Sequence, residues 1–404
     1  MQHEQLQRES DDYPDESTPY GAGQSLALYV HWPFCQSKCP YCDFNSHVRD
    51  GVDQARWRDG LLRELDYFAS VTNYQDIGSI FFGGGTPSLM PPATVAAVID
   101  AAASRWGLAK DVEITLEANP TSVEARNLAD LRAAGVNRVS LGVQSLDDKA
   151  LAFLGREHSA DDAKQAISIS QQLFPRSSFD LIYALPEQSP TTWRRELTDA
   201  LALADCHLSV YQLTIEKGTP FFGDQRRGDW AVPDETVAAE LFEITQDILA
   251  GAGLPAYEIS NHARVGQESR HNLTYWLSRD YIGIGPGAHS RLARHDGAMA
   301  FDQHRIPETW LEAVESRGHG TKNRVAVAPG ARLEEALMMG LRLISGVVRA
   351  EFTRITGSEM EDLLDGGRLN GLIEGGFIEL DKAGIRATPA GLLRLDAVLA
   401  ALFG

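Results

Sequence analysis

Three cysteines in one short stretch are the residues of this chain most suited to chemistry. Cys35, Cys39 and Cys42 follow an apolar, β-branched run and have the spacing C-x3-C-x2-C. Three thiolates on one loop can hold three irons of a [4Fe–4S] cluster, which leaves the fourth iron free for a small molecule. Structural zinc is the alternative, but it takes four ligands, usually as two separated pairs. No second cysteine pair is present, although His47 could complete a zinc site.

The residues around the cysteines carry a resemblance to a known family. With an aromatic residue, Tyr41, before the last cysteine, the stretch resembles the signature of radical S-adenosylmethionine (SAM) enzymes. The longer string YVHWPFC…CPYCDFNSH is similar to the branch that contains oxygen-independent coproporphyrinogen III oxidases (HemN) and heme chaperones (HemW). The resemblance runs from about residue 26 to the C-terminus. In the oxidases a fourth cysteine stands two residues after the third, where this chain has Phe44, so the chaperone group is the closer match.

The resemblance implies a set of SAM-binding residues. The GGGTP stretch at 83–87 corresponds to the segment that contacts the methionine end of SAM, and five further residues match SAM-contacting positions of the oxidases in order and spacing. The expected contacts are Gly84, Gly85, Thr86, Tyr29, Glu117, Gln144, Arg156 and Asp180. These types fit SAM, which needs a carboxylate or amide for its ribose, a cation for its carboxylate and an aromatic or backbone edge for adenine. Each also has a structural interpretation, such as a strand-end carboxylate or, for Arg156, a helix-end cation.

The string HNLTYW, residues 271–276, is a second candidate site. On a helix, His271 and Tyr275 lie on one face, and a capping asparagine with two packing aromatics would explain the pattern equally well. The string is similar to one associated with heme in the chaperone group, which implies His271 as an iron ligand beside aromatic side chains. His289 in GIGPGAHS is the competing histidine. Cys206, at the start of a strand, is expected to be a small buried hydrophobic residue.

Composition limits the kind of protein this chain can be. Its 404 residues include 43% hydrophobic side chains, enough for a large core, and only four cysteines, which indicates a reducing compartment. No apolar run reaches the roughly 18 residues that span a bilayer. The net charge of −19 argues against nucleic-acid binding, which uses basic surfaces. We therefore expect a cytoplasmic protein with no membrane span.

The positions of the apolar runs predict a partial barrel. Six strands alternate with helices, and polar or glycine residues follow the strands where a barrel carries its chemistry. The expected strands are 26–34, 77–84, 112–118, 138–145, 178–186 and 207–215. Intervals of this length leave room for crossover helices, and the apolar strands suit a parallel sheet covered by helices. The predicted fold class is α/β, a partial (β/α)6 TIM-like radical SAM barrel, with a doubly wound sheet as the alternative.

Four segments organise the chain. Residues 1–25 are expected to be a disordered acidic head, 26–220 the barrel, and 221–328 an extension with the HNxxYW string. Residues 329–404 are expected to form a small winged-helix-like domain, which we interpret as a lid or docking domain.

The resemblance implies a function as well as a fold. It indicates a heme chaperone that binds heme and passes it to acceptor proteins, respiratory enzymes among them, with a [4Fe–4S] cluster, SAM and an electron donor such as flavodoxin or ferredoxin. The alternative is an oxygen-independent coproporphyrinogen III dehydrogenase, which decarboxylates propionates by radical chemistry. Phe44 and the HNLTYW string favour the chaperone. The oligomeric state is left open.

Overall fold

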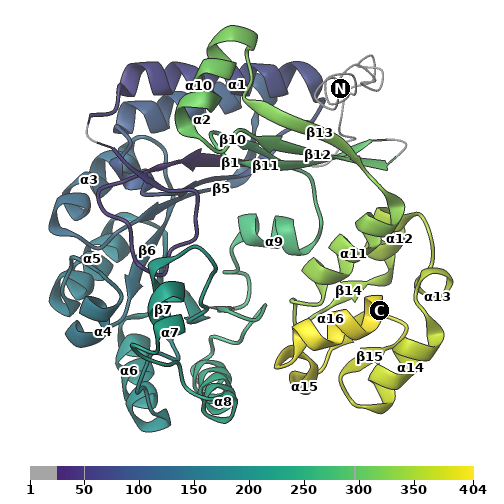
Figure 1. Cartoon of the computed structure of the whole chain (residues 1–404). Coiled ribbons are helices and arrows are strands. Elements are labelled where there is room, and N and C mark those ends of the chain that lie inside the picture. The colour runs from purple at the N-terminus through teal and green to yellow at the C-terminus, as the bar shows by residue number, and fades with distance from the viewer. Residues whose placement is uncertain (1–24, 50, 295–296) are drawn as a thin grey trace, which may run out of the picture.

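The structure is a computed structural model that describes residues 25–49, 51–294 and 297–404. The predicted acidic head, residues 1–25, lies outside this range except for Ser25. Within the described residues, eleven strands form one large sheet in the order β13-β12-β11-β10-β1-β4-β5-β6-β7-β8-β9. The sheet is the scaffold to which the helices and the candidate site belong (Figure 1).

The six predicted strands form a continuous parallel series in this sheet. They are β1 (Leu26–Trp32), β4 (Ile77–Gly84), β5 (Leu108–Ala118), β6 (Arg138–Gln144), β7 (Arg176–Tyr183) and β8 (His207–Gln212). Each pairs in parallel with the next along the chain, so the series never reverses direction across the sheet. A doubly wound sheet requires such a reversal, and that alternative is therefore wrong. The partial barrel is confirmed.

Helices connect the strands and cover the outer face of the sheet (Figure 1). They are α1 (Gln54–Val71), α2 (Pro92–Trp106), α3 (Ser122–Ala133), α4 (Asp148–Phe153), α5 (Ala160–Leu173) and α6 (Pro190–Leu203). Local sequence explains their ends: Ser159 and Asp162 form a capping box at the start of α5, and Gly107 ends α2 with a φ of 78°. Strands buried on both faces and the helices' apolar sides form the main core.

The other edge of the sheet was not predicted in detail. Strand β10 (Tyr281–Ile284) pairs in parallel with β1, and β11 (His289–Arg294), β12 (Gly297–Gln303) and β13 (Thr321–Val327) continue the sheet with antiparallel pairs. Helix α10 (Pro307–Arg317) packs on α1, with the rings of Trp310 and Trp57 stacked 5.3 Å apart. At the far edge, β9 (Asn261–Ala263) pairs with β8, after α7 (Pro220–Arg227) and α8 (Glu235–Gly251).

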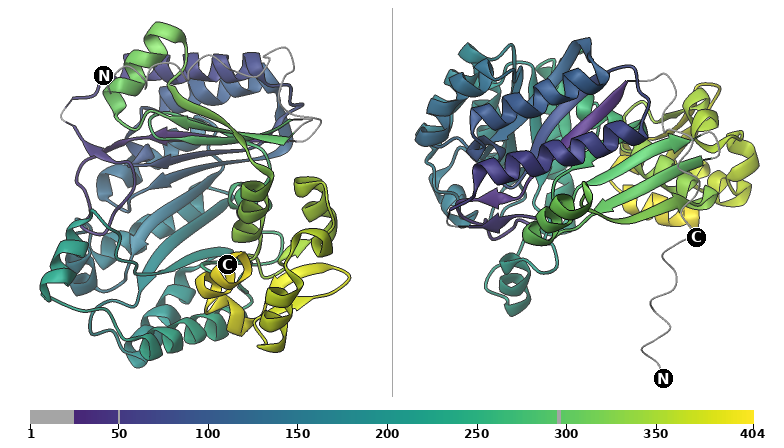
Figure 2. Two further views of the ribbon diagram at one scale, coloured as in Figure 1. Left: turned by 45° about the vertical axis from the view of Figure 1, so that its right-hand side comes forward. Right: turned by 90° about the horizontal axis from the view of Figure 1, so that it is seen from above.

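The C-terminal residues form a second, smaller hydrophobic cluster. Strands β14 (Val347–Val348), β16 (Gly384–Ala387) and β15 (Ile378–Leu380) make a three-stranded sheet among short helices. These helices are α11 (Pro329–Gly340), α12 (Arg349–Thr356), α13 (Met360–Leu363), α14 (Gly366–Glu374), α15 (Pro389–Leu392) and α16 (Leu395–Phe403). Figures 1 and 2 show this part on the opposite side of the molecule from α3 and α5.

Helix α9 (Arg270–Trp276), which carries the HNLTYW string, lies between the sheet and the C-terminal elements (Figure 1). The buried carboxylate of Glu113 on β5 accepts from the backbone N–H of His271 at 3.2 Å and so fixes the start of this helix. At its other end, the Arg342 guanidinium lies 4.5 Å from the ring centroid of Trp276 and pairs with the buried Glu258 carboxylate at 3.1 Å. The predicted helix is therefore anchored at both ends.

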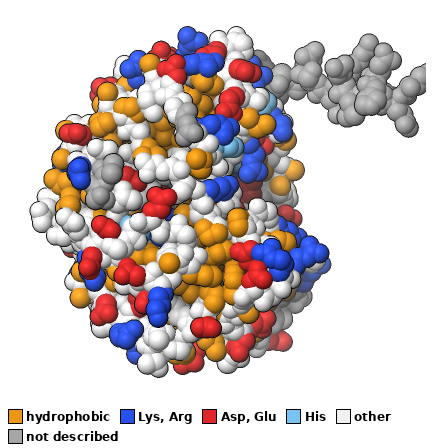
Figure 3. Space-filling model, turned by 60° about the vertical axis from the view of Figure 1, so that its left-hand side comes forward, with side chains coloured by type: hydrophobic (Ala, Val, Ile, Leu, Met, Phe, Trp, Pro, Cys, Tyr) orange, Lys and Arg blue, Asp and Glu red, His pale blue; other side chains and the backbone are white. Residues whose placement is uncertain are grey.

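The surface carries charges of both signs. On the face shown in Figure 3, lysines and arginines are interspersed with aspartates and glutamates, and hydrophobic side chains occupy areas between them. No helix within the described residues has the length and apolar character needed to cross a membrane.

Candidate iron–sulfur and SAM site

The three cysteines lie on a loop between two very short parallel strands. β2 (Phe34–Cys35) and β3 (His47–Val48) pair with each other, and the backbone N–H of His47 donates to the Pro33 carbonyl at 2.7 Å. The loop between them therefore closes on itself and presents the thiols of Cys35, Cys39 and Cys42 from one segment. All three are free and half-buried. Burial raises the pKa of the Cys35 and Cys42 thiols, so metal binding there must displace protons.

The GGGTP stretch holds the start of this loop. The backbone N–H groups of Gly85 and Thr86 donate to the carbonyls of Trp32 and Phe34, at 2.7 and 2.9 Å. A Cβ on Gly85 would lie 2.8 Å from the Phe34 carbonyl oxygen, closer than a side chain can approach, and 3.0 Å from Cys35 Sγ, a tight contact. Gly84 has a φ of 114°, which favours glycine. The glycines thus allow backbone to pack directly against the first cysteine.

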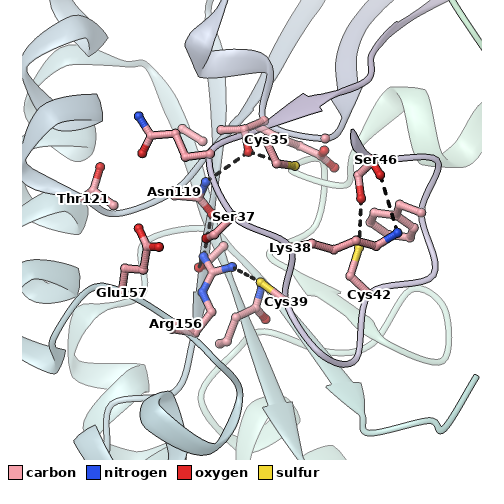
Figure 4. A pocket seen from close by; sticks show the side chains of 18 of the residues that line it. Cys35, Ser37, Lys38, Cys39, Cys42, Ser46, Asn119, Thr121, Arg156 and Glu157 are labelled. Carbon is pink, nitrogen blue, oxygen red and sulfur yellow. Dashed lines mark hydrogen bonds between the residues drawn. The ribbon is translucent and has the colours of Figure 1, made fainter. Parts of the chain in front are cut away.

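The thiols line a cavity at the ends of the parallel strands. It encloses about 1030 Å³ of space, including its opening to solvent, and its wall includes the three cysteines with Gly84, Gly85, Thr86, Glu117, Asn119, Gln144, Arg156 and Asp180. We call it the cysteine cavity. In Figure 4, Asn119 and Arg156 stand on one side, Cys42 and Ser46 on the other, and Cys39 between them. The structure therefore brings together all but one of the predicted SAM residues with the thiols.

The arrangement of the thiols does not match a mononuclear zinc site. In the part of the chain that the structure describes, no three cysteine, histidine or acidic side chains converge closely enough to hold one metal ion. His47 does not line the cysteine cavity, and its Nε2 lies 3.2 Å from Asn45 Oδ1. Zinc needs four ligands at about 2.0–2.3 Å around a single point. Thiols spread around a cavity suit a larger group such as a [4Fe–4S] cluster.

A hydrogen-bonded chain of side chains joins two of the cysteines across the cavity wall. Thr86 Oγ1 donates to Cys35 Sγ at 3.4 Å, and Asn119 Nδ2 donates to Thr86 Oγ1 at 3.4 Å. Arg156 Nη2 donates to Asn119 Oδ1 at 2.6 Å, while its Nη1 donates to Cys39 Sγ at 3.3 Å. Asn119 follows the third predicted strand, as the sequence indicates, but it was not among the expected SAM contacts. This series of hydrogen bonds links Arg156 to Cys35 and Cys39.

Unsatisfied and strained polar groups in the wall fit a bound polar ligand. Gln144 has a positive φ of 72°, and its buried Oε1 has no hydrogen-bond partner among the described residues. Arg156 Nε is likewise buried and unpaired within that set. A buried polar atom without a partner costs free energy unless a ligand or water satisfies it. The wall therefore offers both an acceptor and a donor to the ribose and carboxylate that SAM carries.

Two carboxyl groups lie at the strand ends beside the thiols. Burial and the nearby Asp180 raise the pKa of Glu117 to about 8, and burial raises the pKa of Asp180 to about 6. Ser140 Oγ donates to Asp180 Oδ1 at 3.3 Å and holds that side chain in place. Near neutral pH, Glu117 is largely protonated and can donate as well as accept a hydrogen bond. Such a group suits a ligand hydroxyl.

A small aromatic cluster supports the far end of the cysteine loop. Phe221 on α7 packs against Tyr41 and Phe153, and its backbone N–H donates to the Pro40 carbonyl at 3.1 Å. A Cβ on Gly155 would lie 2.6 Å from Pro40 Cδ, so the loop also lies directly on the backbone after α4. This support comes from the end of α4 and from α7, beyond the sixth strand, and the sequence pattern gave no signal for it.

Tyr29 is the predicted SAM residue that does not line the cysteine cavity. It faces a neighbouring cavity, where its hydroxyl lies 3.0 Å from His31 Nδ1. The two cavities share Phe44, Gly84 and Glu117 as lining residues. The ring of Phe44 is 60% exposed at this boundary. The expectation that Tyr29 contacts SAM stays a prediction.

His271 is a buried core histidine in this structure. Only 1% of its surface is exposed, Ser79 Oγ lies 2.9 Å from Nδ1, and the Tyr275 hydroxyl lies 2.9 Å from Nε2. Burial lowers its pKa to about 3, and its ring stacks on Phe81 at 5.0 Å. Both ring nitrogens are therefore engaged, and iron ligation by His271 requires one of these hydrogen bonds to break. The predicted role as heme ligand stays a prediction.

Comparison with known proteins agrees with this geometry. The family described as Radical SAM superfamily matches residues 29–200, and the family described as HemN C-terminal domain matches residues 327–394. In the solved structures, the chain resembles coproporphyrinogen III oxidase (HemN) of Escherichia coli with a TM-score of 0.78, over 94% of this chain and 90% of that one. The sequences are 21% identical, so this likeness shows the fold alone.

Relatives of higher identity match the chain over nearly its whole length. The mitochondrial radical S-adenosyl methionine domain-containing protein 1 of Bos taurus is 42% identical, over 98% of this chain and 92% of that protein. The heme chaperone HemW of Escherichia coli is 39% identical, over 82% of this chain and 86% of its own length. HemW of Mycobacterium tuberculosis is 33% identical, over 95% and 96%. The chain therefore belongs to the radical SAM superfamily, in the family of HemW and radical S-adenosyl methionine domain-containing protein 1.

Proposed function

We propose that this chain is a heme chaperone of the HemW type, which binds heme and transfers it to acceptor hemoproteins with the help of a [4Fe–4S] cluster and SAM. The observation that carries the proposal is the wall of the cysteine cavity, where three thiols meet Arg156, Glu117, Gln144 and Asp180. A relative named heme chaperone, 39% identical over most of both chains, supports the heme part. Phe44, in place of the oxidases' fourth cysteine, supports the chaperone over the dehydrogenase.

The residues of the cysteine cavity have separate proposed roles. Cys35, Cys39 and Cys42 would hold the cluster, which when bound supplies one-electron reducing power and an iron site open to SAM. Arg156, already oriented by its hydrogen bonds, would bind the SAM carboxylate. The remaining polar groups of SAM would be bound by the side chains of Glu117, Gln144 and Asp180. The backbone of Gly84–Thr86 would take part in this binding. In this arrangement the protein's part is to orient SAM and limit water.

The proposal includes partners and a location. An electron donor such as flavodoxin or ferredoxin would reduce the cluster, and respiratory enzymes are among the heme acceptors we expect. The net charge of −19 argues against nucleic acid as a partner. A cytoplasmic location remains part of the proposal, while the relatives from animals are named mitochondrial.

Anaerobic reconstitution followed by two parallel assays tests this function. The first follows transfer of heme from the loaded chain to a heme-free globin by absorbance, and the second follows conversion of coproporphyrinogen III by chromatography. We expect heme transfer without conversion, and loss of the cluster in Cys39→Ala but not in the matched control Cys206→Ala, whose buried thiol lies outside the cavity. Conversion of coproporphyrinogen III without heme transfer would establish the dehydrogenase instead.

A further inference from the structure

Several cationic side chains lie beside the cysteine loop, on a chain whose net charge is −19. They come from the loop itself, from the segment that precedes α10, from the end of α10 and from β13. The members, all exposed or half-buried, are Lys38, His47, Arg49, Arg305, Arg317 and Lys322. We call this area the cationic surface. On the face shown in Figure 3, lysine and arginine side chains gather near histidine side chains.

Two contacts hold the cysteine loop against the start of α10. Asn45 Nδ2 donates to the Arg305 carbonyl at 2.8 Å, and the Arg49 guanidinium pairs with the Glu308 carboxylate at 3.0 Å. The loop and the 305–308 segment are therefore neighbours, although about 260 positions separate them in the sequence. Their cations form one surface and not two.

The charges of this surface act together around two histidines. Burial lowers the pKa of His47, Glu308 opposes this shift, and three cations add to it: Arg49, Lys38 and Arg305. Burial likewise lowers the pKa of His304, and two cations add to this shift: Arg317 and Lys322. Within the described residues, three of these cations form no ion pair with a carboxylate: Lys38, Arg305 and Lys322. Their positive charge is therefore available to a partner.

The cationic surface lies directly beside the predicted cluster ligands. Val48 is paired with Cys35 across the short β2–β3 sheet, in which neighbouring strands lie about 4.8 Å apart. Lys38 Nζ donates to the Ser46 carbonyl at 3.5 Å, and the Ser46 hydroxyl lies 3.9 Å from Cys42 Sγ (Figure 4). The rate of electron transfer falls steeply with distance. An electron that arrives at this surface has a short path to the thiols.

Exposed apolar side chains lie among the cations. Phe44 and Ile306 are each 60% exposed, and Val48 is 46% exposed. Apolar contacts surrounded by polar and charged groups are the usual arrangement of a protein–protein interface. Interfaces between redox partners are among the smallest, below about 1,200 Å² in total, so a few apolar side chains are sufficient.

We propose that the cationic surface is the docking site of a small acidic protein that carries an electron on a flavin or an iron–sulfur centre. This inference rests on the proposed function, which includes such a donor, and it specifies where the donor binds. Acidic groups of the donor face Lys38, Arg305 and Lys322, and its apolar side chains pack on the exposed ones of this chain. The donor is oxidised by one electron, and the cluster held by the three thiols is reduced by that electron.

Charge complementarity also explains why this face is used. The chain as a whole is acidic and repels an acidic donor, so the cationic surface selects the one orientation that brings the donor's redox centre to the cysteine loop. Attraction of this kind raises association rates and weakens as salt is added.

Binding of the apoprotein to an immobilised acidic flavodoxin and to an immobilised acidic ferredoxin tests the assignment. Surface plasmon resonance at about 0.02 and about 0.5 M salt should show binding that weakens as salt rises. In Arg305→Glu/Lys322→Glu we expect affinity lower by about tenfold or more at the lower salt concentration. Lys382→Glu/Arg394→Glu is the matched control, because it changes the net charge equally at exposed positions of the C-terminal part. It should bind as the unchanged chain does.

The rate of cluster reduction provides a second measurement. After reconstitution, Arg305→Glu/Lys322→Glu should be reduced more slowly than the control by flavodoxin hydroquinone. Photoreduced deazariboflavin, a small neutral reductant that needs no docking surface, should reduce both variants equally. A variant that is slow with both reductants would place the defect in the cluster and overturn the assignment.

The outcomes separate this inference from the proposed function. If neither donor protein binds, or if both bind Arg305→Glu/Lys322→Glu as tightly as the control, the docking site is overturned while heme transfer is unaffected. Tighter binding of a DNA oligonucleotide than of either donor, lost in the same variant, also overturns it. If heme transfer is absent but donor binding depends on these two cations, the proposed function fails and the docking site stands.

Discussion

The most informative single substitution is Arg156→Lys, which keeps the positive charge but removes the planar donor fork. Arg156 Nη2 donates to Asn119 Oδ1 at 2.6 Å and to the Gly142 carbonyl at 2.7 Å, while Nη1 reaches Cys39. A lysine offers one compact ammonium and cannot bind two wall acceptors and a ligand carboxylate in the same geometry. The variant therefore tests whether SAM binding needs the planar donor geometry of arginine, because the positive charge is kept.

The magnitude follows from the lost contacts. A hydrogen bond to a charged group contributes about 1.5–3 kcal/mol. Loss of one such bond to the SAM carboxylate therefore lowers affinity roughly 10- to 150-fold, because each 1.4 kcal/mol is tenfold. We expect Arg156→Ala to lose more, since the Asn119 and Gly142 oxygens are then left without their donor.

Anaerobic calorimetry with SAM is the assay, with affinity expressed per cluster-loaded chain from the iron content. Arg394→Lys is the matched control, because Arg394 is exposed and far from the cavity lining. Equal SAM affinity in Arg156→Lys and the unchanged chain would refute the proposed role of the fork.

Three further predictions test other parts of the site. The pKa of Glu117 is raised to about 8 in the folded protein, whereas in the unfolded chain it is about 4.5. Between these two pH values the folded protein therefore keeps a proton on Glu117 that the unfolded chain has lost. Glu117 therefore makes the apoprotein less stable as the pH rises from about 4.5 to 8. Glu117→Gln should flatten this part of a plot of thermal midpoint against pH. An unchanged slope would contradict the raised pKa of Glu117. Phe44 is largely exposed at the boundary of both cavities, so Phe44→Ala should leave the thermal midpoint unchanged and weaken heme retention in an equilibrium dialysis assay, and full retention contradicts its place in the cavity wall. Asn45→Ala removes two hydrogen bonds of about 1 kcal/mol each between the cysteine loop and the 285–305 segment, and it should lower iron retention of the reconstituted chain; unchanged iron retention would contradict the support that these bonds give the loop.

The parts of the fold that follow local rules could be predicted. Near-continuous apolar runs identify the six parallel strands, and Ser159 with Asp162 marks the start of α5. Because parallel strands end at the same edge of a barrel, residues at their ends meet there, and this is why Glu117, Gln144 and Asp180 line one cavity with the cysteines.

The parts that depend on distant contacts could not. The partners of His271 include Ser79, which is 192 positions away, and no local pattern shows that both of its nitrogens are occupied. Tyr29 lies on a strand that is buried almost throughout, so the sequence does not indicate which cavity its side chain enters. The pairing of His289 with Asp302 depends on the register of a hairpin that the sequence did not reveal.

The family resemblance and the residue chemistry reach the same site by separate routes. The resemblance supplied the SAM residues. The structure adds the unpaired Oε1 of Gln144, the hydrogen bonds that link Cys35 to Cys39 through Asn119, and the neighbouring cavity that Tyr29 faces.

Mössbauer spectroscopy of the chain reconstituted with ⁵⁷Fe, recorded with and without SAM, tests most directly the claim that three thiols leave one iron of a cubane cluster open. The account predicts a [4Fe–4S] cluster in which SAM alters the signal of one iron, and loss of that cluster when Cys35, Cys39 and Cys42 are all replaced by alanine. A spectrum that SAM leaves unchanged, or iron that persists in the triple-alanine variant, would contradict it.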